Sequence, residues 1–524
     1  MGKHVIVIAD DLGVEGYSRT APESGIATTF APRTPNLDAL ADAGVRFRRF
    51  YVNPRCSPSR SLFYTGRYAF RTGMGNNATP AVGPPGSSES WFPLALTSHV
   101  CANIGKWHLY STTNGNFLSP LTSANGGVAG LDRWHGVYGN IIQGLSTYWY
   151  WPRYLDGTLS DLSLAEQVIG NSDGISNRVA TNYCTTINID DAIDWIGDQS
   201  GDWVCVVATC APHSPLHQPP TLAEREAAGY GVGSRLMSAT METVTTAYNE
   251  ILGNTNVEAN QAILDGLGWP SSLDTITANA SYAAHISMIE AADTEIGRLL
   301  DDANVDIATN SDVTVWYISD NGASTTVIGP QGKNTVNDLG TRVPMIVAGN
   351  HVTATGGSTC DRLVDMVDIW RTLLALESVD PATAFPGVTV DGVDMSALLA
   401  NPSAAGPRAF SYTEAFATTD TGNPEGLAAG ALETGATGDS TYPQLASWDR
   451  AVHSDEFSLL QQNTYTSAGV RTVTHQLFNH VGGDRLNASD LLVTQELDFD
   501  SVSRDTAPWR ALQELVAQLA LLAP

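Results

Sequence analysis

The sequence predicts an α/β protein with a large, mostly parallel or mixed sheet flanked by helices, and a smaller C-terminal α+β subdomain. Three continuous apolar runs, at 4–9, 203–209 and 313–319, have the length of strands buried on both faces. Such strands belong in the middle of a mostly parallel sheet that helices cover on both sides. Apolar residues at helical spacing lie between these runs, as at 279–302. A chain of 524 residues is long enough for one large domain with an appendage.

The composition changes near the end of the chain and indicates a second, smaller unit. From about residue 408 the sequence becomes rich in Thr, Gly and Ala. Short strand patterns and a final amphipathic helix are expected there, at 409–416, 448–461, 469–479 and 509–522. We therefore predict a main α/β domain over 1–405. Residues 406–524 should form a subdomain of an antiparallel sheet and a terminal helix.

The chain is strongly acidic, which excludes some classes of partner. It holds 27 Lys and Arg against 55 Asp and Glu, for a formal net charge of −28. This balance argues against nucleic acid or an anionic membrane as a partner. No apolar run predicts a membrane span. The chain begins directly on a strand, so we expect no signal peptide in it unless one has been removed, and localisation and oligomeric state stay open.

The six cysteines do not follow the spacing of a disulfide framework or a zinc site. No C-x-x-C pair occurs, and no Cys/His cluster has zinc-ligand spacing. Most of them lie in apolar surroundings, so apart from Cys56 we expect reduced core residues.

Acidic and amide side chains follow two of the predicted central strands. Asp10 and Asp11 come directly after the first strand, and Asp320 and Asn321 come directly after the strand at 313–319. Ligands of open α/β sheets bind at the carboxyl ends of strands. Adjacent carboxylate and amide oxygens suit a hard cation there, although a solvated turn is the simpler interpretation of each pair alone.

Residues 55–68 are typical of a site that holds an anion against a small reactive side chain. A helix at 34–44 and a strand at 45–51 lead into this stretch. If a helix begins near Ser57, with Pro58 in its first turn, Arg60 lies one turn from Cys56. Free N–H groups at the helix N-terminus favour negative charge beside Cys56. A buried structural cysteine beside an arginine is the competing interpretation.

Two further stretches place cations and histidines where they can act on an anion. Lys106 and His108 lie two positions apart, on the same side of an expected extended segment. One cation and one titratable base facing the same point suit an oxyanion and a proton transfer. His213 follows the strand at 203–209 directly, on a loop that prolines stiffen. His217, on the same loop, is treated as a neighbour that is not essential.

An aromatic-rich segment lies at 131–156. For any one ring of this segment, packing in an irregular region is the favoured interpretation. The alternative is a wall that contacts an organic group or sugar rings of a substrate.

Several short strings, in this order, resemble the formylglycine-dependent sulfatases of the alkaline-phosphatase superfamily nearly from end to end. They are D-D at 10–11, T-P-N-L-D-A-L-A-D-A-G at 34–44, C-S-P-S-R with T-G-R at 56–67, G-K-W-H-L at 105–109, A-P-H at 211–213, and S-D-N-G, G-K and G-T-R-V-P at 319–344. Two positions depart from the family pattern. Tyr110 replaces a glycine, and Asp338-Leu339-Gly340 stands where E-G-G is common.

The resemblance implies an alkaline-phosphatase-like fold and a sulfuric ester hydrolase. It implies that Cys56 is oxidised to formylglycine by a maturing enzyme before the chain folds. It further implies Ca²⁺, or Mg²⁺ as a substitute, and a sulfate ester of a small molecule or saccharide as substrate. The implied metal ligands are Asp10, Asp11, Cys56, Asp320 and Asn321. The implied catalytic residues are Cys56, Arg60, Lys106, His108, His213 and Lys333, with Lys106, His213, Lys333 and Arg342 binding the substrate.

The implied reaction has two halves. One hydroxyl of the hydrated aldehyde at residue 56 attacks sulfur, while His213 or Lys333 protonates the leaving alcohol. The second hydroxyl then gives its proton to His108, the C=O bond re-forms and sulfate leaves. An unmodified Ser or Cys has no second hydroxyl with which to expel the ester.

Two other functions compete with this interpretation. A phosphonate monoester or phosphodiester hydrolase of the same superfamily can also carry C-x-P-x-R. Relatives that act on phosphate commonly have D-H where this chain has Asp320-Asn321, and a histidine suits a softer metal. The chain could also be a catalytically silent binding protein on the same scaffold, which its full set of cationic and acid–base residues disfavours.

Overall fold

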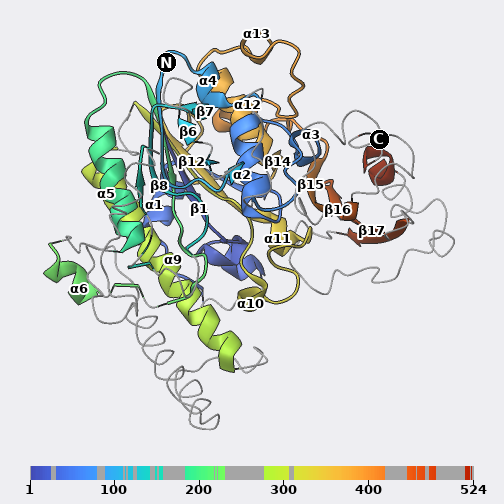
Figure 1. Cartoon of the computed structure of the whole chain (residues 1–524), viewed down its shortest axis with the longest axis horizontal. Helices are drawn as coiled ribbons and strands as arrows, with labels where there is room; N and C mark the ends of the chain where they lie inside the picture. The colour runs from blue at the N-terminus through green and yellow to red at the C-terminus, as the bar shows by residue number, and fades with distance from the viewer. Residues whose placement is uncertain are drawn as a thin grey trace.

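The structure is a computed structural model of the whole chain (Figure 1). It describes all residues except 1, 25–30, 79–88, 110–111, 114–115, 118, 122–126, 142–147, 150, 152, 157–182, 218, 221, 230–275, 306–311, 419–444, 456, 466–470, 480–513, 520 and 522–524. Tyr110 and part of the aromatic-rich segment at 131–156 therefore lie outside the described residues.

The three predicted apolar strands lie side by side at the centre of a ten-stranded sheet. Strand β1 (Lys3–Ala9) pairs in parallel with β10 (Trp203–Ala208) on one side and with β11 (Val313–Ser319) on the other. Ile6 and Ile8 of β1 belong to one hydrophobic cluster, and Val5 and Val7 belong to another. The strand is therefore buried on both faces, as its continuous apolar sequence predicts.

The rest of this sheet is mixed. The strand order is β13-β2-β12-β11-β1-β10-β3-β8-β9, with β14 also paired to β2. Strand β12 is antiparallel to both β11 and β2, and β9 is antiparallel to β8, whereas the other pairs are parallel. The further strands are β2 (Val45–Tyr51), β3 (Val100–Lys106), β8 (Arg133–Val137), β9 (Tyr154–Leu155), β12 (Arg342–Gly349), β13 (Ser358–Cys360) and β14 (Val364–Asp365).

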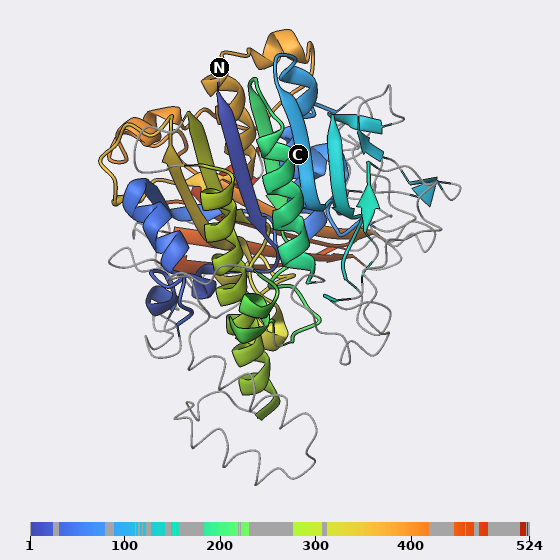
Figure 2. The ribbon, with the colours of Figure 1, turned by 90° about the vertical axis from the view of Figure 1, so that its left-hand side faces the viewer.

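Helices cover both faces of the sheet (Figures 1 and 2). One face carries α1 (Pro35–Ala43), α5 (Cys184–Gly197) and α9 (Ile276–Asp302), whose apolar residues share a cluster with Val5 and Val7. The other face carries α2 (Cys56–Thr65) and α12 (Met366–Leu376). The predicted α/β class is confirmed.

The starts and stops of two predicted helices can be compared with the structure. Helix α1 begins after Thr34 and ends before Gly44, as predicted, but the Thr34 hydroxyl makes no cap and instead accepts a hydrogen bond from the Ser18 N–H at 3.2 Å. Helix α2 begins at Cys56, one residue before the predicted start. It ends at Gly66, whose φ of 68° a glycine adopts readily.

A second, four-stranded antiparallel sheet forms the C-terminal part of the molecule. Its strands are β15 (Ser411–Thr418), β16 (Leu445–His453), β17 (Phe457–Tyr465) and β18 (Arg471–Asn479). The single strand predicted at 448–461 is wrong: the chain turns back there, with the Ser454 N–H bonded to the Phe457 carbonyl at 2.7 Å. Residues 514–519 are helical, within the predicted terminal helix. The domain boundary at 405/406 stays a prediction.

Shorter elements complete the described fold. They are η1 (Val14–Gly16), η2 (Ala21–Ser24), α3 (Ala69–Thr72), α4 (Phe92–Ala95), β4 (Thr112–Thr113), β5 (Asn116–Phe117), β6 (Ser119–Leu121), β7 (Gly127–Leu131), α6 (Leu222–Ala227), α10 (Thr325–Ile328), α11 (Asp338–Thr341), α13 (Pro381–Ala384) and α14 (Ser396–Ala400). All six cysteines are buried free thiols. Among the described helices, none is long and apolar enough to cross a membrane.

Candidate active site

Two aspartates lie where β1 ends. The Asp10 N–H donates to the Ala211 carbonyl at 3.2 Å, which ties the strand end to the loop after β10. Asp11 has a left-handed φ of 64°, and its N–H donates to Asp320 Oδ1 at 3.2 Å. Both carboxyl groups are buried. The chain therefore turns sharply out of the strand and presents two carboxylates at the carboxyl edge of the sheet, where Asp320 also lies.

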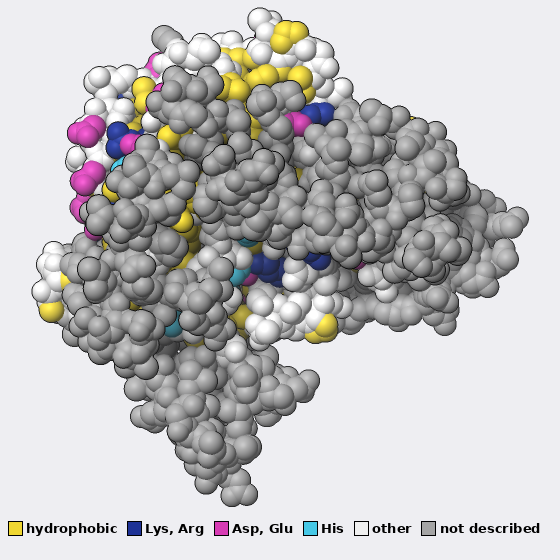
Figure 3. Space-filling model, in the orientation of Figure 1, with side chains coloured by type: hydrophobic (Ala, Val, Ile, Leu, Met, Phe, Trp, Pro, Cys, Tyr) yellow, Lys and Arg dark blue, Asp and Glu magenta, His cyan; other side chains and the backbone are white. Residues whose placement is uncertain are grey.

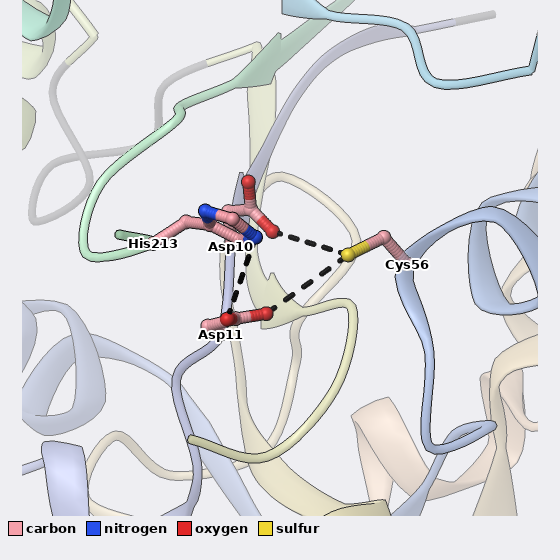
Figure 4. Close-up of side chains that lie close together, drawn as sticks. All are labelled: Asp10, Asp11, Cys56 and His213. Carbon is pink, nitrogen blue, oxygen red and sulfur yellow. Dashed lines mark hydrogen bonds and ion pairs between the residues drawn. The ribbon is translucent and has the colours of Figure 1, made fainter. Parts of the chain in front are cut away.

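Cys56 faces these carboxylates from the first position of α2 (Figure 4). Its Sγ lies 3.5 Å from Asp10 Oδ1 and 3.9 Å from Asp11 Oδ1. The side chain is fully buried. A helix N-terminus and the end of the central strand thus converge on one sulfur atom.

Each of the three aspartates is paired with a cation. Lys106 Nζ lies 2.6 Å from Asp10 Oδ2, and Lys333 Nζ lies 2.5 Å from Asp11 Oδ1 and 3.3 Å from Cys56 Sγ. Arg60 holds Asp320 Oδ2 with Nε at 3.0 Å and Nη2 at 2.9 Å, and its Nη1 donates to the Lys106 carbonyl at 2.8 Å. The three negative and three positive charges balance, so one added divalent cation would leave the site positively charged for an anion.

The pKa values of Asp10 and Lys333 move in the directions that this pairing requires, whereas burial and the nearby Asp10 raise the pKa of Asp320 to about 6. Burial alone would raise the pKa of Asp10, but Lys106 and the other nearby cations lower it overall. Burial alone would lower the pKa of Lys333, but Asp11, Cys56 and Asp10 raise it overall. Both groups are therefore charged at neutral pH.

Asn321 gives a test of whether the site fits a metal ion. Its Nδ2 donates to Asp11 Oδ1 at 2.8 Å and to the Gly322 carbonyl at 2.8 Å. Its Oδ1 is buried and accepts no hydrogen bond from any described residue. A buried carbonyl oxygen without a donor is costly unless a cation or water satisfies it. With the neighbouring carboxylates it forms an oxygen-rich donor set, which suits a hard cation.

His213 adds a nitrogen to the same group of donors. Ligand atoms of Asp10, Asp11, Cys56 and His213 all lie within 4.8 Å of one another. His213 Nε2 is 3.7 Å from Asp11 Oδ2. The predicted ligand set contains no His213, so the structure adds one nitrogen that the sequence interpretation assigned to catalysis and substrate binding.

His108 reaches the site differently from the way its sequence predicts. Strand β3 ends at Lys106, and His108 has a left-handed φ of 55°. The extended segment predicted to carry Lys106 and His108 on one side is therefore wrong at His108, because the backbone turns there while its N–H donates to the Tyr138 carbonyl at 2.7 Å. Burial, then Lys106 and Arg60, lower the pKa of His108 well below its usual value, so its ring is neutral.

The site has a closed end and an open end. The Lys106 side chain is fully buried, and that of Arg60 is 1% exposed, whereas the side chains of Lys333 and His213 keep 10% and 12% of their surface exposed. Figure 3 shows Lys or Arg side chains beside His side chains near the middle of the face that it presents. The closed end thus lies at Lys106 and Arg60, and the open end lies at Lys333 and His213.

The remaining predicted site residue does not join this cluster through its described contacts. Arg342 begins β12, where its Nε lies 3.5 Å from Asp338 Oδ2 and its Nη1 donates to the Arg48 carbonyl at 3.4 Å. Its role in binding substrate stays a prediction.

The described rings of the aromatic segment mostly pack inside the protein. Tyr148, Trp149 and Trp151 are buried in a cluster with Tyr183. The ring of His217 lies against Tyr148 and Trp149, at centroid distances of 4.4 and 4.9 Å. For these residues the packing interpretation holds, and His217 belongs to the packing.

Sequence reasoning missed two residues that contact the loop of His213. The Tyr148 hydroxyl donates to the His213 carbonyl at 2.8 Å, and His285 in α9 hydrogen-bonds to the Pro212 carbonyl. The sequence placed Tyr148 only in the aromatic-rich segment and His285 only in the helix at 279–302, and neither pattern indicates a contact with this loop.

Comparisons with known proteins agree with this geometry. Human steryl-sulfatase is 36% identical over 115 residues, which are 20% of this chain and 18% of that protein. Human arylsulfatase A is 38% identical over 126 residues, 22% of each chain. These alignments thus span about a fifth of each relative's length. Rat arylsulfatase G is 24% identical over 435 residues, 77% of this chain and 70% of that protein.

Solved structures share the fold over nearly the whole chain. BT4656, solved in complex with its substrate D-glucosamine-2-N,6-O-disulfate, has a TM-score of 0.60 at 16% identity and covers 99% of this chain and 97% of that one. Phosphonate monoester hydrolase of Agrobacterium radiobacter has a TM-score of 0.62 at 18% identity, with 99% and 95% covered. At such identities the likeness shows the fold, which is that of the sulfatases and alkaline phosphatase.

The decisive comparison is with the family itself. The model of the Sulfatase family matches residues 3–378, which include every strand end and loop that contributes to the site. The chain belongs to the sulfatase family.

Proposed function

We propose that this protein hydrolyses sulfate esters to an alcohol and inorganic sulfate, with a nucleophile derived from Cys56. The observation that carries the proposal is the position of Cys56 Sγ, buried between two carboxylates and 3.3 Å from Lys333 Nζ. A reactive side chain in such a place faces both a candidate cation site and a balanced set of charges. This arrangement is suited to the transfer of a small oxyanion.

The thiol itself is a poor candidate for the nucleophile. Burial raises the pKa of Cys56 to about 12, more than Lys106 and Lys333 lower it. An unmodified Cys56 would be a protonated thiol at neutral pH, and the thiolate is the reactive form. Formylglycine, which the family implies at this position, supplies two hydroxyl groups when it is hydrated.

Modification of Cys56 would have to precede folding. The side chain has no exposed surface in the folded protein. A formylglycine-generating enzyme would therefore act on the unfolded chain. This partner is part of the proposal.

The buried cations would hold the sulfate group through the whole reaction. Lys106 and Arg60 lie at the closed end, where negative charge on the sulfate oxygens is best compensated. Lys333, between Cys56 and the open end, would contact both the sulfate and the bridging oxygen. Lys106 and Arg60 would thus stabilise the sulfate oxygens throughout, and Lys333 would in addition stabilise the leaving oxygen.

Proton transfer would be divided between the two histidines. The leaving alcohol must lie toward the open end, where His213 and Lys333 are partly exposed, so one of these two groups would protonate it. His108 is buried and neutral, so it would accept the proton of residue 56 when sulfate is released.

We further propose that the site holds Ca²⁺, with Mg²⁺ as a substitute. Asp10, Asp11, Asp320 and Asn321 would supply oxygen ligands, and the oxygen of the modified residue 56 would complete the set. When bound, the ion supplies positive charge that polarises the sulfate group. The buried Asn321 Oδ1, which accepts no hydrogen bond from described residues, is the observation that supports a cation here.

A phosphonate monoester or phosphodiester hydrolase is the second candidate, since two structural neighbours are phosphonate monoester hydrolases. Asn321 favours a sulfatase, because an amide oxygen suits calcium better than a softer transition metal. A silent binding protein is disfavoured, because the site keeps its acids paired with Arg60, Lys106 and Lys333.

The test compares substrates at one site. Protein produced together with a formylglycine-generating enzyme is assayed with 4-nitrophenyl sulfate and with a 4-nitrophenyl phosphonate monoester, and Cys56→Ala is the matched control. We expect kcat/KM to be higher for the sulfate and to vanish in the control. A preference for the phosphonate would select the second candidate, and no turnover of either ester by fully modified protein would reject both.

A further inference from the structure

The turn that carries His213 has a hydrogen bond on every backbone carbonyl from Cys210 to Pro215. The donors are His213 N to Cys210 O (3.0 Å), Asp10 N and Thr209 Oγ1 to Ala211 O (3.2 and 3.0 Å), His285 to Pro212 O, Tyr148 Oη to His213 O (2.8 Å), His213 Nδ1 to Ser214 O (2.7 Å) and His217 Nδ1 to Pro215 O (2.7 Å). Loops on a protein surface ordinarily leave several such groups to water. The turn is therefore fixed partly by its own side chains and partly by Asp10, Tyr148 and His285 from other elements.

Tyr148 makes the contact that spans the turn. Its hydroxyl lies 2.5 Å from the Cys210 carbonyl and 2.8 Å from the His213 carbonyl. One O–H is thus shared between the carbonyls of Cys210 and His213. The side chain is buried, and its ring packs against Tyr183 and His217. The hydroxyl and the ring are separable, because a phenylalanine would keep the packing and lose only the shared hydrogen bond.

The orientation of the His213 ring depends on this turn. Nδ1 donates to the Ser214 carbonyl at 2.7 Å, within the same turn. That contact leaves Nε2 as the nitrogen that faces the site, 3.7 Å from Asp11 Oδ2, and Nε2 carries a proton for the leaving alcohol when the ring is an imidazolium. A shift of the turn would therefore move Nε2 relative to Asp11 and Cys56 without removing any group from the site.

We propose that Tyr148 is a positioning residue for His213 in sulfate ester hydrolysis. The inference rests on the proposed function, because Tyr148 would position the histidine that protonates the leaving alcohol. Tyr148 acts through the backbone of residues 210 and 213 and does not touch the substrate. Misplacement of a reacting group by about 1 Å can cost about 10²-fold in rate.

The experiment uses Tyr148→Phe in the full-length, formylglycine-containing protein. Sulfate esters are compared along a series from 4-nitrophenol to a poorly acidic alkyl alcohol. We expect kcat for the alkyl ester to fall about 10- to 100-fold, as for a displaced acid. KM for the alkyl ester and kcat for the nitrophenyl ester, whose leaving group needs no proton, should stay unchanged.

Tyr183→Phe is the matched control. It removes a hydroxyl from the same aromatic cluster, one that contacts His217 Nε2 at 3.1 Å and makes no described bond to the His213 backbone. We expect this variant to keep the wild-type leaving-group dependence. The double variant Tyr148→Phe/His213→Ala should be no slower than His213→Ala alone, because Tyr148 acts only through His213.

Three results would overturn the inference. They are an equal loss along the whole leaving-group series, an equal loss in Tyr183→Phe, or additive losses in the double variant. Failure of the proposed function has a different signature, because the wild-type protein itself would then not hydrolyse the sulfate esters. If His213→Ala showed no leaving-group dependence while the wild type remained active, Lys333 would be the acid and Tyr148 would lose its assigned role.

Discussion

Two buried charged clusters lie at opposite ends of the same central strand, and they differ in whether the protein itself satisfies their buried oxygen atoms. At the amino end of β1, the Glu377 carboxylate accepts hydrogen bonds from the Gly2 N–H at 2.9 Å, His4 Nε2 at 2.8 Å and His99 Nε2 at 3.0 Å. At the carboxyl end lies the candidate active site, which comprises Asp10, Asp11, Cys56, His213, Asp320, Asn321 and Lys333. We call these the amino-end and the carboxyl-end cluster.

The two clusters differ in what satisfies their polar groups. The Glu377 carboxylate is fully buried and satisfied by the protein itself. In the carboxyl-end cluster, Asn321 Oδ1 accepts no hydrogen bond from described residues, and two cationic or titratable groups keep a path to solvent. Buried charge is costly unless it is paired. A cluster whose carboxylate the protein satisfies therefore serves stability, whereas a cluster with an unsatisfied buried oxygen needs a ligand from outside.

The largest expected effect is the loss of the proposed nucleophile in the carboxyl-end cluster. Cys56→Ala should fold normally but lose turnover, on the order of 10⁶-fold as for other covalent nucleophiles. Cys56→Ser should be almost as poor after one turnover, since a serine has no second hydroxyl, and intact-mass measurement should find a sulfated serine. Normal steady-state hydrolysis by either variant would contradict the assignment.

The next largest effect should come from removal of the metal, which concerns the carboxyl-end cluster and not the amino-end cluster. A chelator should abolish sulfate ester hydrolysis, and added Ca²⁺ should restore it, because the oxygen donors of the carboxyl-end cluster are the proposed ligands. Elemental analysis should find one Ca²⁺ or Mg²⁺ per chain. Asn321→Ala should lower that stoichiometry, with Asn401→Ala, at an exposed position, as control. Two zinc ions per chain would instead place the protein with the phosphatases.

The proton-transfer groups should give intermediate effects that differ in kind. His213→Ala should cost about 10²- to 10⁴-fold for an ester of a poorly acidic alcohol and little for a nitrophenyl ester. His108→Ala should slow sulfate release whatever the leaving group, so that sulfated enzyme accumulates, and Lys106→Ala should weaken both steps. Asn401→Ala, at an exposed position, is again the control. An equal loss along the whole series in His213→Ala would refute the division between the two histidines.

The amino-end cluster should give the smallest effect on activity and a measurable effect on stability. Glu377→Gln should lower the free energy of unfolding by about 1–3 kcal/mol, because buried donors lose their acceptor, and should leave kcat unchanged. Urea unfolding and a sulfate ester assay measure the two quantities. A loss of kcat without a loss of stability would show that the amino-end cluster also serves catalysis.

Lowering the pH should reveal the same contribution of Glu377 to the free energy of unfolding. Burial alone would raise the pKa of Glu377, but hydrogen bonds from His4 and His99 lower it overall below its value in the unfolded chain. A carboxylate of this kind stabilises the fold above its unfolded pKa, near 4.5, and the stabilisation is lost as the pH falls below that value. The unfolding free energy should therefore decline less in Glu377→Gln than in the wild type between pH 5 and pH 3.

The sequence predicted the central strands and most of the site for the same physical reason. Runs that are apolar on both faces can only be central strands, and polar residues that follow them must meet at one edge of the sheet. Asp10, Asp11, Asp320 and His213 meet there. The hairpin at Ser454 escaped prediction because short antiparallel strands with polar faces carry little periodic signal.

The groups that hold the site in place could not be predicted from the sequence. Tyr148 reaches the turn of His213 from 62 and 65 residues away, to the carbonyls of Cys210 and His213. At His108, the left-handed backbone is accompanied by a hydrogen bond from its N–H to the carbonyl of Tyr138, which directly follows β8. Such contacts follow from tertiary packing and leave no local pattern.

The most direct test of the central claim measures residue 56 and turnover in the same preparations. The protein is produced with graded amounts of a formylglycine-generating enzyme. Peptide mass spectrometry gives the fraction of Cys56 converted to the aldehyde. The maximal rate of sulfate ester hydrolysis, divided by the total protein concentration, gives kcat. We predict that kcat rises in proportion to the converted fraction and extrapolates to zero for unmodified Cys56. Turnover by protein whose Cys56 is entirely a thiol, or none by fully converted protein, would contradict the account.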